Sequence, residues 1–189
     1  MSDDILLVDE DNNPIGTGEK MDVHKRGLLH RCFSILIYNS KREMLLQRRA
    51  ISKYHCPGLW SNACCSHPRP GDHLMLAARR RLKEEMGISV PLKEAGVEFI
   101  YKVKVGDLIE HEYDHLLYGI FDGAPKINPD EVGEWKWVAF DDLRHDMKAN
   151  PDSYTPWFRL IVSQGDNQVD QISVPRLEKY QIKKLETYG

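Results

Sequence analysis

One segment of the chain has the periodicity of an amphipathic helix, and predicted strands lie on both sides of it. In residues 72–87, DHLMLAARRRLKEEMG, apolar side chains recur at every fourth position: Leu74, Ala78, Leu82 and Met86. This spacing places them on one face of a helix, which has to be buried against another element. We expect Asp72 to cap the N-terminus of this helix and Gly87 to terminate it.

The segments before and after this helix have the pattern of short strands joined by turns. Before it, we expect two strands around residues 13–14 and a hairpin around residues 39–41. After it, we expect a second hairpin around residues 106–107 and a further strand, WKWVAF, at residues 135–140. The pattern predicts an α+β fold in which helices sandwich a mixed β-sheet that is preceded by short N-terminal strands.

Two further helices are expected beyond the last strand. Thr155 and Pro156 have the pattern of an N-cap followed by proline at the first helical position, so residues 156–164 are predicted to be helical. Residues 174–189 are expected to form a polar C-terminal helical extension. With 189 residues and 41% hydrophobic content, the chain can bury one full core, and we expect a single domain over residues 1–189.

The composition limits the location and the partners of the protein. A net charge of -3 does not indicate a nucleic-acid partner, although a local group of basic residues could bind a small anion. No apolar run is long enough to cross a bilayer and the N-terminus has no signal-like segment, so we expect a cytoplasmic protein that does not bind membranes. The four cysteines are therefore expected to be reduced.

The segment WSNACCSHP contains two adjacent cysteines followed by a histidine. Cys64 and Cys65 lack the spacing of a structural zinc knuckle, and the other cysteines supply no matching pair. His67 is a candidate metal ligand, because His24 and His30 lie ahead of a predicted strand and offer two more imidazoles. Taken singly, each of these histidines is more often a solvated or hydrogen-bonded side chain than a ligand.

Two glutamates could complete a metal site. Glu110 and Glu112 are two residues apart in a predicted strand, so their carboxylates point to the same face. Alternating glutamates usually form the solvated face of a strand, but a buried pair would need a cation or a proton between its like charges. Together with three imidazoles, these carboxylates would form a ligand set that suits zinc, manganese or magnesium.

Basic residues lie on both sides of the cysteine segment. Arg48, Arg49 and Lys53 precede it, and residues 79–81 are three consecutive arginines on the predicted helix. Arginines on a helix ordinarily pair with acids on its solvated face. Near a metal ion, however, a guanidinium can bind two oxygens of a diphosphate at once.

The predicted helix resembles an altered Nudix box, whose full form is Gly, five residues, Glu, seven residues and Arg-Glu-hydrophobic-x-Glu-Glu-x-Gly. Aligned on Gly87, this chain has Ser66 for the first Gly, Asp72 for the first Glu and Arg81 for the Glu that follows Arg80. Nudix hydrolases use several carboxylates of this helix to hold the metals that activate water. An arginine among them implies that hydrolysis has been lost.

Over residues 4–165 the chain is similar to type 1 isopentenyl-diphosphate delta-isomerases of the Nudix superfamily. The matching segments are LLHRCFSILIYN, LQRRAISKYHCPGLWSNACCSHP, the altered box, EHEYDHLLYG and TPWFRL, and their shared order makes a chance similarity remote. The resemblance implies a Nudix-like core, with residues 166–189 outside it. It also implies an enzyme of isoprenoid biosynthesis that interconverts isopentenyl diphosphate and dimethylallyl diphosphate; we expect a monomer or a weak dimer.

The resemblance further implies roles for individual residues. The catalytic groups correspond to Cys65 and to Glu112, which works with Tyr101. The first metal site, for Mn2+, Zn2+ or Mg2+, corresponds to His24, His30, His67, Glu110 and Glu112. The gap between His24 and His30 is one residue shorter than in some members of the family. A second ion, Mg2+, corresponds to Glu85, the main-chain carbonyl of Cys65 and the substrate diphosphate, and no organic cofactor is implied.

The remaining implied roles concern the substrate. The cations that bind the diphosphate correspond to Lys20, Arg49, Lys53 and Arg81. The arginine that alters the Nudix box therefore acquires a role. Trp157 corresponds to a tryptophan that faces the hydrocarbon, where the face of its ring would stabilise a carbocation.

The implied reaction explains why these residue types are needed. A proton is added at C4 and another is removed from C2, through a tertiary carbocation. Glu112, held at a metal by one oxygen, could move a proton on the other with help from Tyr101, while Cys65 acts from the opposite side of the double bond. We expect Glu112 and Tyr101 to be the donors and Cys65 to be a thiolate base.

Two alternatives belong to other functional classes. A Nudix hydrolase that acts on nucleoside diphosphates would release phosphate-containing fragments. A metal-stapled binding module would have no turnover and would lose its fold on addition of a chelator.

Overall fold

The computed structural model describes residues 3–163, which contain a mixed β-sheet and the helices that cover it. The strands are β1 (Asp4–Val8), β2 (Pro14–Glu19), β3 (His30–Tyr38), β4 (Met44–Arg49), β5 (Trp60–Asn62), β6 (Cys64–Ser66), β7 (Lys93–Val105), β8 (Leu108–Ile120) and β9 (Val132–Val138). The helices are α1 (Lys20–Arg26), α2 (Leu74–Met86), α3 (Phe140–Ala149) and α4 (Pro156–Ser163), with a 3-10 turn at Pro151–Ser153. The helix predicted at residues 174–189 lies outside the described residues.

Strand β3 lies at the centre of the sheet and brings distant parts of the chain together. It pairs with β8 in parallel and with β6 in antiparallel orientation, and β8 in turn pairs with β7. In this register Glu112 lies opposite His30 on one side and opposite Tyr101 on the other. Three of the residues singled out in the sequence therefore occupy neighbouring positions on adjacent strands.

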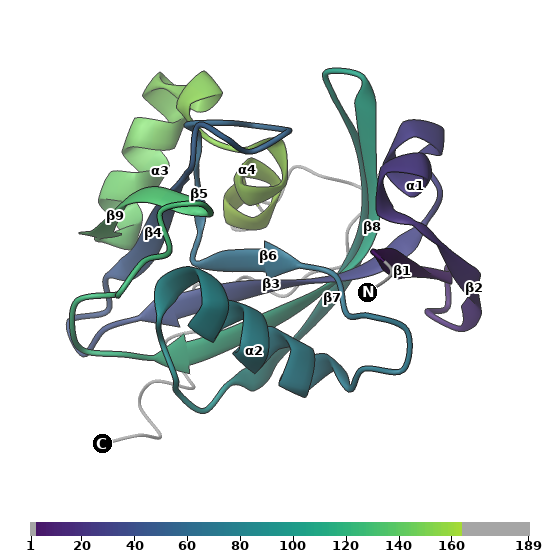
Figure 1. Ribbon diagram of the computed structural model, residues 1–189. Helices are drawn as coiled ribbons and strands as arrows, with labels where there is room; N and C mark the ends of the chain where they lie inside the picture. The colour runs from purple at the N-terminus through teal and green to yellow at the C-terminus, as the bar shows by residue number, and fades with distance from the viewer. Residues whose placement is uncertain (1–2, 164–189) are drawn as a thin grey trace.

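Helices cover both faces of the sheet, as predicted. Phe33 and Ile35 of β3 pack in one apolar cluster with residues of α2. The next residue on the same strand, Leu36, packs in a second cluster with residues of α3 and α4. Figure 1 shows α2 on one side of the sheet and both α3 and α4 on the other. This alternation is the period-two pattern of a strand that is buried on both faces.

Helix α2 ends as predicted but begins differently. Gly87 terminates it in the left-handed region at φ 66°, and a Cβ at this position would lie 2.6 Å from the carbonyl oxygen of Lys126. The prediction that Asp72 is the N-cap is wrong, because His73 occupies that position and makes no side-chain cap. Asp72 instead accepts a hydrogen bond from Arg80 at 2.6 Å.

The other strand predictions are largely confirmed. The turns at residues 13–14 and 106–107 connect the antiparallel pairs β1–β2 and β7–β8. The turn at residues 39–41 connects β3 to β4, but these strands pair only at Tyr38 and Met44. Strand β4 pairs mainly with β5 and β9 instead, which turns this part of the sheet away from β3 and opens space between the two groups of strands.

Helix α1 was not predicted, although it carries two of the candidate residues. Glu19 caps its N-terminus by accepting hydrogen bonds from the main-chain nitrogens of Met21 and Asp22 at 3.0 and 2.8 Å. Gly27 ends it in the left-handed region at φ 61°. The helix places Lys20 and His24 one turn apart. Among residues 3–163, no helix combines the length and the apolar character that crossing a bilayer requires.

Candidate active site

Four of the five predicted ligands of the first metal site converge. His24, His30, His67 and Glu112 each offer one ligand atom, and these atoms all lie within 4.8 Å of one another. They come from α1, from the start of β3, from the residue after β6 and from β8. Three of the four residues are buried, and His67 is partly buried.

Main-chain hydrogen bonds orient two of these imidazoles. The Nδ1 atoms of His24 and His30 lie 2.6 and 2.9 Å from the carbonyl oxygens of Lys20 and Leu28. Because a carbonyl oxygen only accepts, each Nδ1 donates, and Nε2 of the neutral ring carries a lone pair. Nε2 of His30 lies 3.1 Å from Nε2 of His67. Nε2 of His24 is buried without a hydrogen-bond partner among the described residues. Such convergence fits a cation.

Glu110 lies beside this cluster and extends it. Its Oε2 is 3.2 Å from Nε2 of His24, and its buried Oε1 is 3.1 Å from Nε2 of His55. Burial raises the pKa of Glu110. Burial works the other way on His24, but the neighbouring Glu110 carboxylate outweighs it and raises the pKa of that imidazole. A proton on His24 would balance the charge of Glu110, as a divalent cation at this site would.

The two oxygens of Glu112 face different neighbours. Oε1 lies 2.8 Å from Nε2 of His67 and 3.4 Å from Nε2 of His30. Oε2 accepts hydrogen bonds from the Tyr101 hydroxyl and, at 3.0 Å, from the Cys32 thiol. Burial opposes the charge of Glu112, yet the hydrogen bonds from the two histidines outweigh it and hold the pKa of this carboxyl well below its usual range. One oxygen is thus turned to the histidines and the other to proton donors.

The Cys65 thiol lies on the other side of β3. Its Sγ donates to Oδ1 of Asn62 at 3.0 Å and lies 3.4 Å from Oγ of Ser34. The Ser34 hydroxyl donates to Asp114 at 2.8 Å. Burial, reinforced by the negative charge of Asp114, raises the pKa of Cys65 to about 12. This environment favours the thiol form of Cys65, and the role of a thiolate base stays a prediction from the sequence.

Cys64 has a different environment from its neighbour. In the β3–β6 register, Ser34 lies opposite Cys65 and Ile35 lies opposite Cys64. Cys64 is fully buried in the apolar cluster beneath α2, as expected for a residue that packs inward. Adjacent thiols on one strand thus face opposite sides of the sheet, and only one of them lines the cavity.

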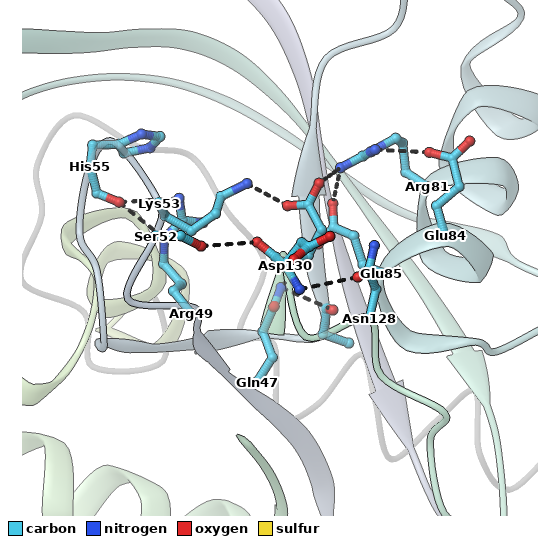
Figure 2. Close-up of polar contacts among 12 residues, drawn as sticks. Gln47, Arg49, Ser52, Lys53, His55, Arg81, Glu84, Glu85, Asn128 and Asp130 are labelled. Atoms are coloured by element: carbon cyan, nitrogen blue, oxygen red, sulfur yellow. Dashed lines mark hydrogen bonds and ion pairs between the residues drawn. The ribbon is translucent and has the colours of Figure 1, made fainter. Parts of the chain in front are cut away.

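The predicted diphosphate-binding residues lie at the other end of the same cavity. Lys20, Arg49, Lys53 and Arg81 all line it, together with Glu85. Arg81 donates to Glu85 at 2.6 Å, and Figure 2 shows these two side chains meeting at the end of α2. Burial raises the pKa of Glu85. These residues come from α1, from the end of β4, from the loop after it and from α2, and ion pairs join Lys53 and Arg81 to Glu131.

Trp157 forms part of the cavity wall between the two ends. It is buried at the start of α4, and its Nε1 donates to Oγ of Ser61 at 3.1 Å. The guanidinium of Arg49 lies 5.4 Å from the centroid of its ring, and the His55 ring lies 5.5 Å away. The indole is thus held in place by a hydrogen bond and has a cation over its ring.

The structure therefore brings all the predicted site residues together. All of them line one cavity except His24 and His30, which lie behind Glu110 and Glu112 and contact them. The sequence interpretation gave no role to five further residues of the cavity and its immediate surroundings: Cys32, Tyr54, His55, Asn62 and Glu131. Asn62 lies within the segment WSNACCSHP, so its proximity to Cys65 was the one signal available. Cys32, Tyr54 and His55 lie within motifs that matched the family but were given no role, and only Glu131 lies outside every quoted motif.

Comparison with known proteins agrees with this geometry. The NUDIX domain family model matches residues 28–158. A curated protein of Aromatoleum aromaticum, isopentenyl-diphosphate Delta-isomerase 2, is 51% identical over 158 residues, which cover 83% of each chain. Isopentenyl-diphosphate Delta-isomerase of Serratia proteamaculans is 47% identical over 173 residues, covering 90% of this chain and 96% of that protein.

A solved structure shares the fold at low sequence identity. The DR0079 protein of Deinococcus radiodurans superposes with a TM-score of 0.67 at 16% identity, covering 84% of this chain and 96% of the other. This likeness supports a Nudix fold and nothing more specific. With relatives this similar over most of its length, the chain belongs to the Nudix superfamily and, within it, to the isopentenyl-diphosphate delta-isomerase family.

Proposed function

We propose that this protein interconverts isopentenyl diphosphate and dimethylallyl diphosphate. The proposal rests on the environment of Glu112. One of its carboxylate oxygens faces the histidines, and the other accepts a hydrogen bond from the Tyr101 hydroxyl. A carboxyl held in this way can exchange a proton through its second oxygen without leaving its ligand position. Relatives that are 51% and 47% identical carry the name of this reaction.

The second proton-transfer group is Cys65. It reaches the cavity from β6, whereas Glu112 reaches it from β8, and these strands flank β3 on opposite sides. An alkene between them would have an acidic or basic group on each side. One group adds a proton at C4 and the other removes one from C2, so the substrate passes through a tertiary carbocation and its atoms are conserved. The Trp157 ring, on the cavity wall, stabilises that cation.

The charged residues fit a divalent cation at each end of the cavity. His24, His30, His67, Glu110 and Glu112 would hold one ion, and Glu85 with the carbonyl of Cys65 would hold Mg2+ together with the diphosphate. When bound, these ions supply positive charge that increases the acidity of a ligated carboxyl and neutralises phosphate oxygens. Lys20, Arg49, Lys53 and Arg81 anchor the diphosphate, which leaves the five-carbon chain to extend toward Trp157.

Hydrolysis of a diphosphate is less well supported. The residue that replaces the box glutamate, Arg81, forms ion pairs with Glu84 and Glu85 at 2.8 and 2.6 Å. Its positive charge occupies the part of the helix where a hydrolase would gather metal-binding carboxylates. The same charge is suited to grip a phosphate that is retained.

Proton NMR of isopentenyl diphosphate in deuterated buffer with Mg2+ tests the proposal directly. We expect conversion to dimethylallyl diphosphate with deuterium entering at C4, and no phosphate release in a parallel assay. Release of phosphate or pyrophosphate without an allylic product would reject the isomerase function in favour of the hydrolase. The cytoplasmic location and the monomeric or weakly dimeric state stay predictions from the sequence.

A further inference from the structure

Glu131 bridges two cations that come from different parts of the fold. Its Oε2 accepts a hydrogen bond from Nζ of Lys53, and its Oε1 accepts one from Nη2 of Arg81 at 3.2 Å. All three side chains are largely buried, with 22 to 24% of their surface exposed. Among the described residues, Glu131 is the only hydrogen-bond partner of the Lys53 ammonium. Glu131 belongs to neither the Nudix box nor the motifs of the sequence interpretation.

Main-chain hydrogen bonds hold the loop that carries Glu131. Its nitrogen donates to the carbonyl of Asn128 at 3.0 Å, and its own carbonyl accepts from the nitrogen of Ala50 at the same distance. The nitrogen of Asn128 donates to the carbonyl of Glu85 at 2.9 Å. This loop is thus tied to the end of α2 on one side and to the loop after β4 on the other. Figure 2 shows it between Lys53 and Arg81.

Considered only as a negative charge, Glu131 would be expected to weaken the binding of a diphosphate. Lys53 and Arg81 repel each other, and so would a carboxylate and a bound diphosphate. A carboxylate that only added negative charge would weaken diphosphate binding. The bridge has a second effect, however, because it fixes the spacing of two flexible cations and still leaves each of them further N–H donors for a ligand.

We propose that Glu131 is a positioning residue for diphosphate binding, which holds Lys53 and Arg81 at the spacing needed to grip the substrate from both sides. The inference rests on the proposed function, because it assumes that a diphosphate occupies this end of the cavity. It assigns the residue no proton transfer. Its effect is therefore expected in KM, with kcat unchanged within about twofold.

Binding of inorganic pyrophosphate in the presence of Mg2+, measured by titration calorimetry at constant ionic strength, separates the two effects. Glu131→Gln removes the charge, and Glu131→Asp keeps it but shortens the reach. We expect both variants to bind about tenfold more weakly, which corresponds to about 1.4 kcal/mol. The matched control is Glu84→Gln, which removes an exposed carboxylate that pairs with Arg81 but bridges nothing to Lys53; it should bind like the wild type.

The possible results of this titration distinguish the positioning role of Glu131 from the proposed diphosphate site itself. Binding by Glu131→Gln that is equal to or tighter than that of the wild type would overturn the positioning role, as would wild-type affinity in Glu131→Asp. Failure of the wild type itself to bind pyrophosphate would overturn the proposed diphosphate site and this inference with it. Thermal unfolding of each variant shows whether it is folded, and the KM of any variant with turnover repeats the comparison with isopentenyl diphosphate itself.

Discussion

The two ends of the cavity differ in the groups that orient their side chains. The histidine end is formed by buried strand residues and by α1, and its imidazoles are oriented by main-chain carbonyls. At the end proposed for the diphosphate, carboxylates orient Lys53 and Arg81, and the main-chain carbonyl of His55 orients Arg49. The histidine end gathers imidazole and carboxylate lone pairs around one point. At the other end, Lys53 and Arg81 already have carboxylate partners.

This difference indicates how each end responds to its ligand. Imidazole and carboxylate lone pairs that converge in a buried site gain most from a cation, because no water reaches them. Partly exposed cations that already have carboxylate partners gain less, since a diphosphate has to compete with those partners and with solvent. We therefore expect the histidine end to contribute to the stability of the fold and the diphosphate end to contribute mainly to affinity.

Removal of divalent cations should have the largest effect, and it should act through the histidine end. A chelator is expected to abolish turnover and to lower the unfolding temperature by about 10 °C, if the site is filled at a thousandfold excess over its dissociation constant and contributes about 4 kcal/mol. Differential scanning calorimetry with and without added Mn2+, Zn2+ or Mg2+ measures this. His30→Asn should lose the metal-dependent rise, while the exposed control His145→Asn keeps it. An equal rise in both variants would place the ion elsewhere.

The next largest effect on turnover is expected for Glu112, whose two carboxylate oxygens have different neighbours. Glu112→Gln keeps the shape of the side chain but removes its ability to exchange a proton, so turnover should fall by about a thousandfold or more. Glu98→Gln is the control, because Glu98 lies on β7 and pairs with His115 outside the cavity. Isomerisation is followed by proton NMR, and circular dichroism checks the fold. Substantial activity in Glu112→Gln would remove this residue from the proposed mechanism.

The two adjacent cysteines offer a matched pair. Cys65→Ala should lower turnover by about a thousandfold with little loss of stability, because its side chain borders the cavity. Cys64→Ala should keep turnover but lower the free energy of unfolding by about 1 kcal/mol, since it leaves a small void in the core beneath α2. Chemical denaturation and the NMR assay give both quantities. The opposite pattern would mean that the register of β6 has been misassigned.

Substitution of Trp157, on the wall of the cavity, should have a moderate effect on kcat. Trp157→Phe is expected to lower kcat by about tenfold, because a phenyl ring stabilises a desolvated cation less than an indole does. Ser61→Ala removes the hydrogen bond to the indole and leaves the ring in place, so it should retain nearly full turnover. If Trp157→Phe has wild-type kcat and only a lower unfolding temperature, the residue is structural.

The smallest effect concerns the stability contributed by the diphosphate end. Burial opposes the charge of Glu131, but the hydrogen bonds and positive charges of Lys53 and Arg81 together outweigh it and lower the pKa of this carboxyl in the folded protein. A depressed pKa contributes stability above the usual carboxylate range, and this contribution is lost as the pH falls through the folded pKa. Glu131→Gln should therefore cost less than about 1 kcal/mol at pH 7 and nothing in acid. A larger cost that persists at low pH would show that the bridge holds the fold itself.

The parts of the site that were predictable from the sequence have a local pattern. The spacing of Glu110 and Glu112 placed both carboxylates on one face of a strand, and the ordered motifs located Cys65 and the cations. The mixed sheet and α2 followed from periodicity in the same way. Each of these features depends on residues that are close together in the sequence.

The parts that were missed depend on contacts between distant segments. Cys32 meets Glu112 only because β3 pairs with β8, and Glu131 meets Lys53 only because two loops are hydrogen-bonded to each other. The reference pKa of a thiol already makes Cys65 mostly protonated at neutral pH, and burial together with the charge of Asp114, a residue of the distant strand β8, raises that pKa further. The N-cap of α2 differed because Arg80, about two turns further on, takes the Asp72 carboxylate.

Helix α1 lies ahead of the segment that the NUDIX domain model covers, since that match begins at residue 28. Its seven residues supply both Lys20, at the mouth of the cavity, and His24, at the back. A truncated chain that began with the conserved domain would thus retain a sheet and a box but lack an anchor and a ligand. The proposed site therefore cannot be assembled from the matched Nudix segment alone.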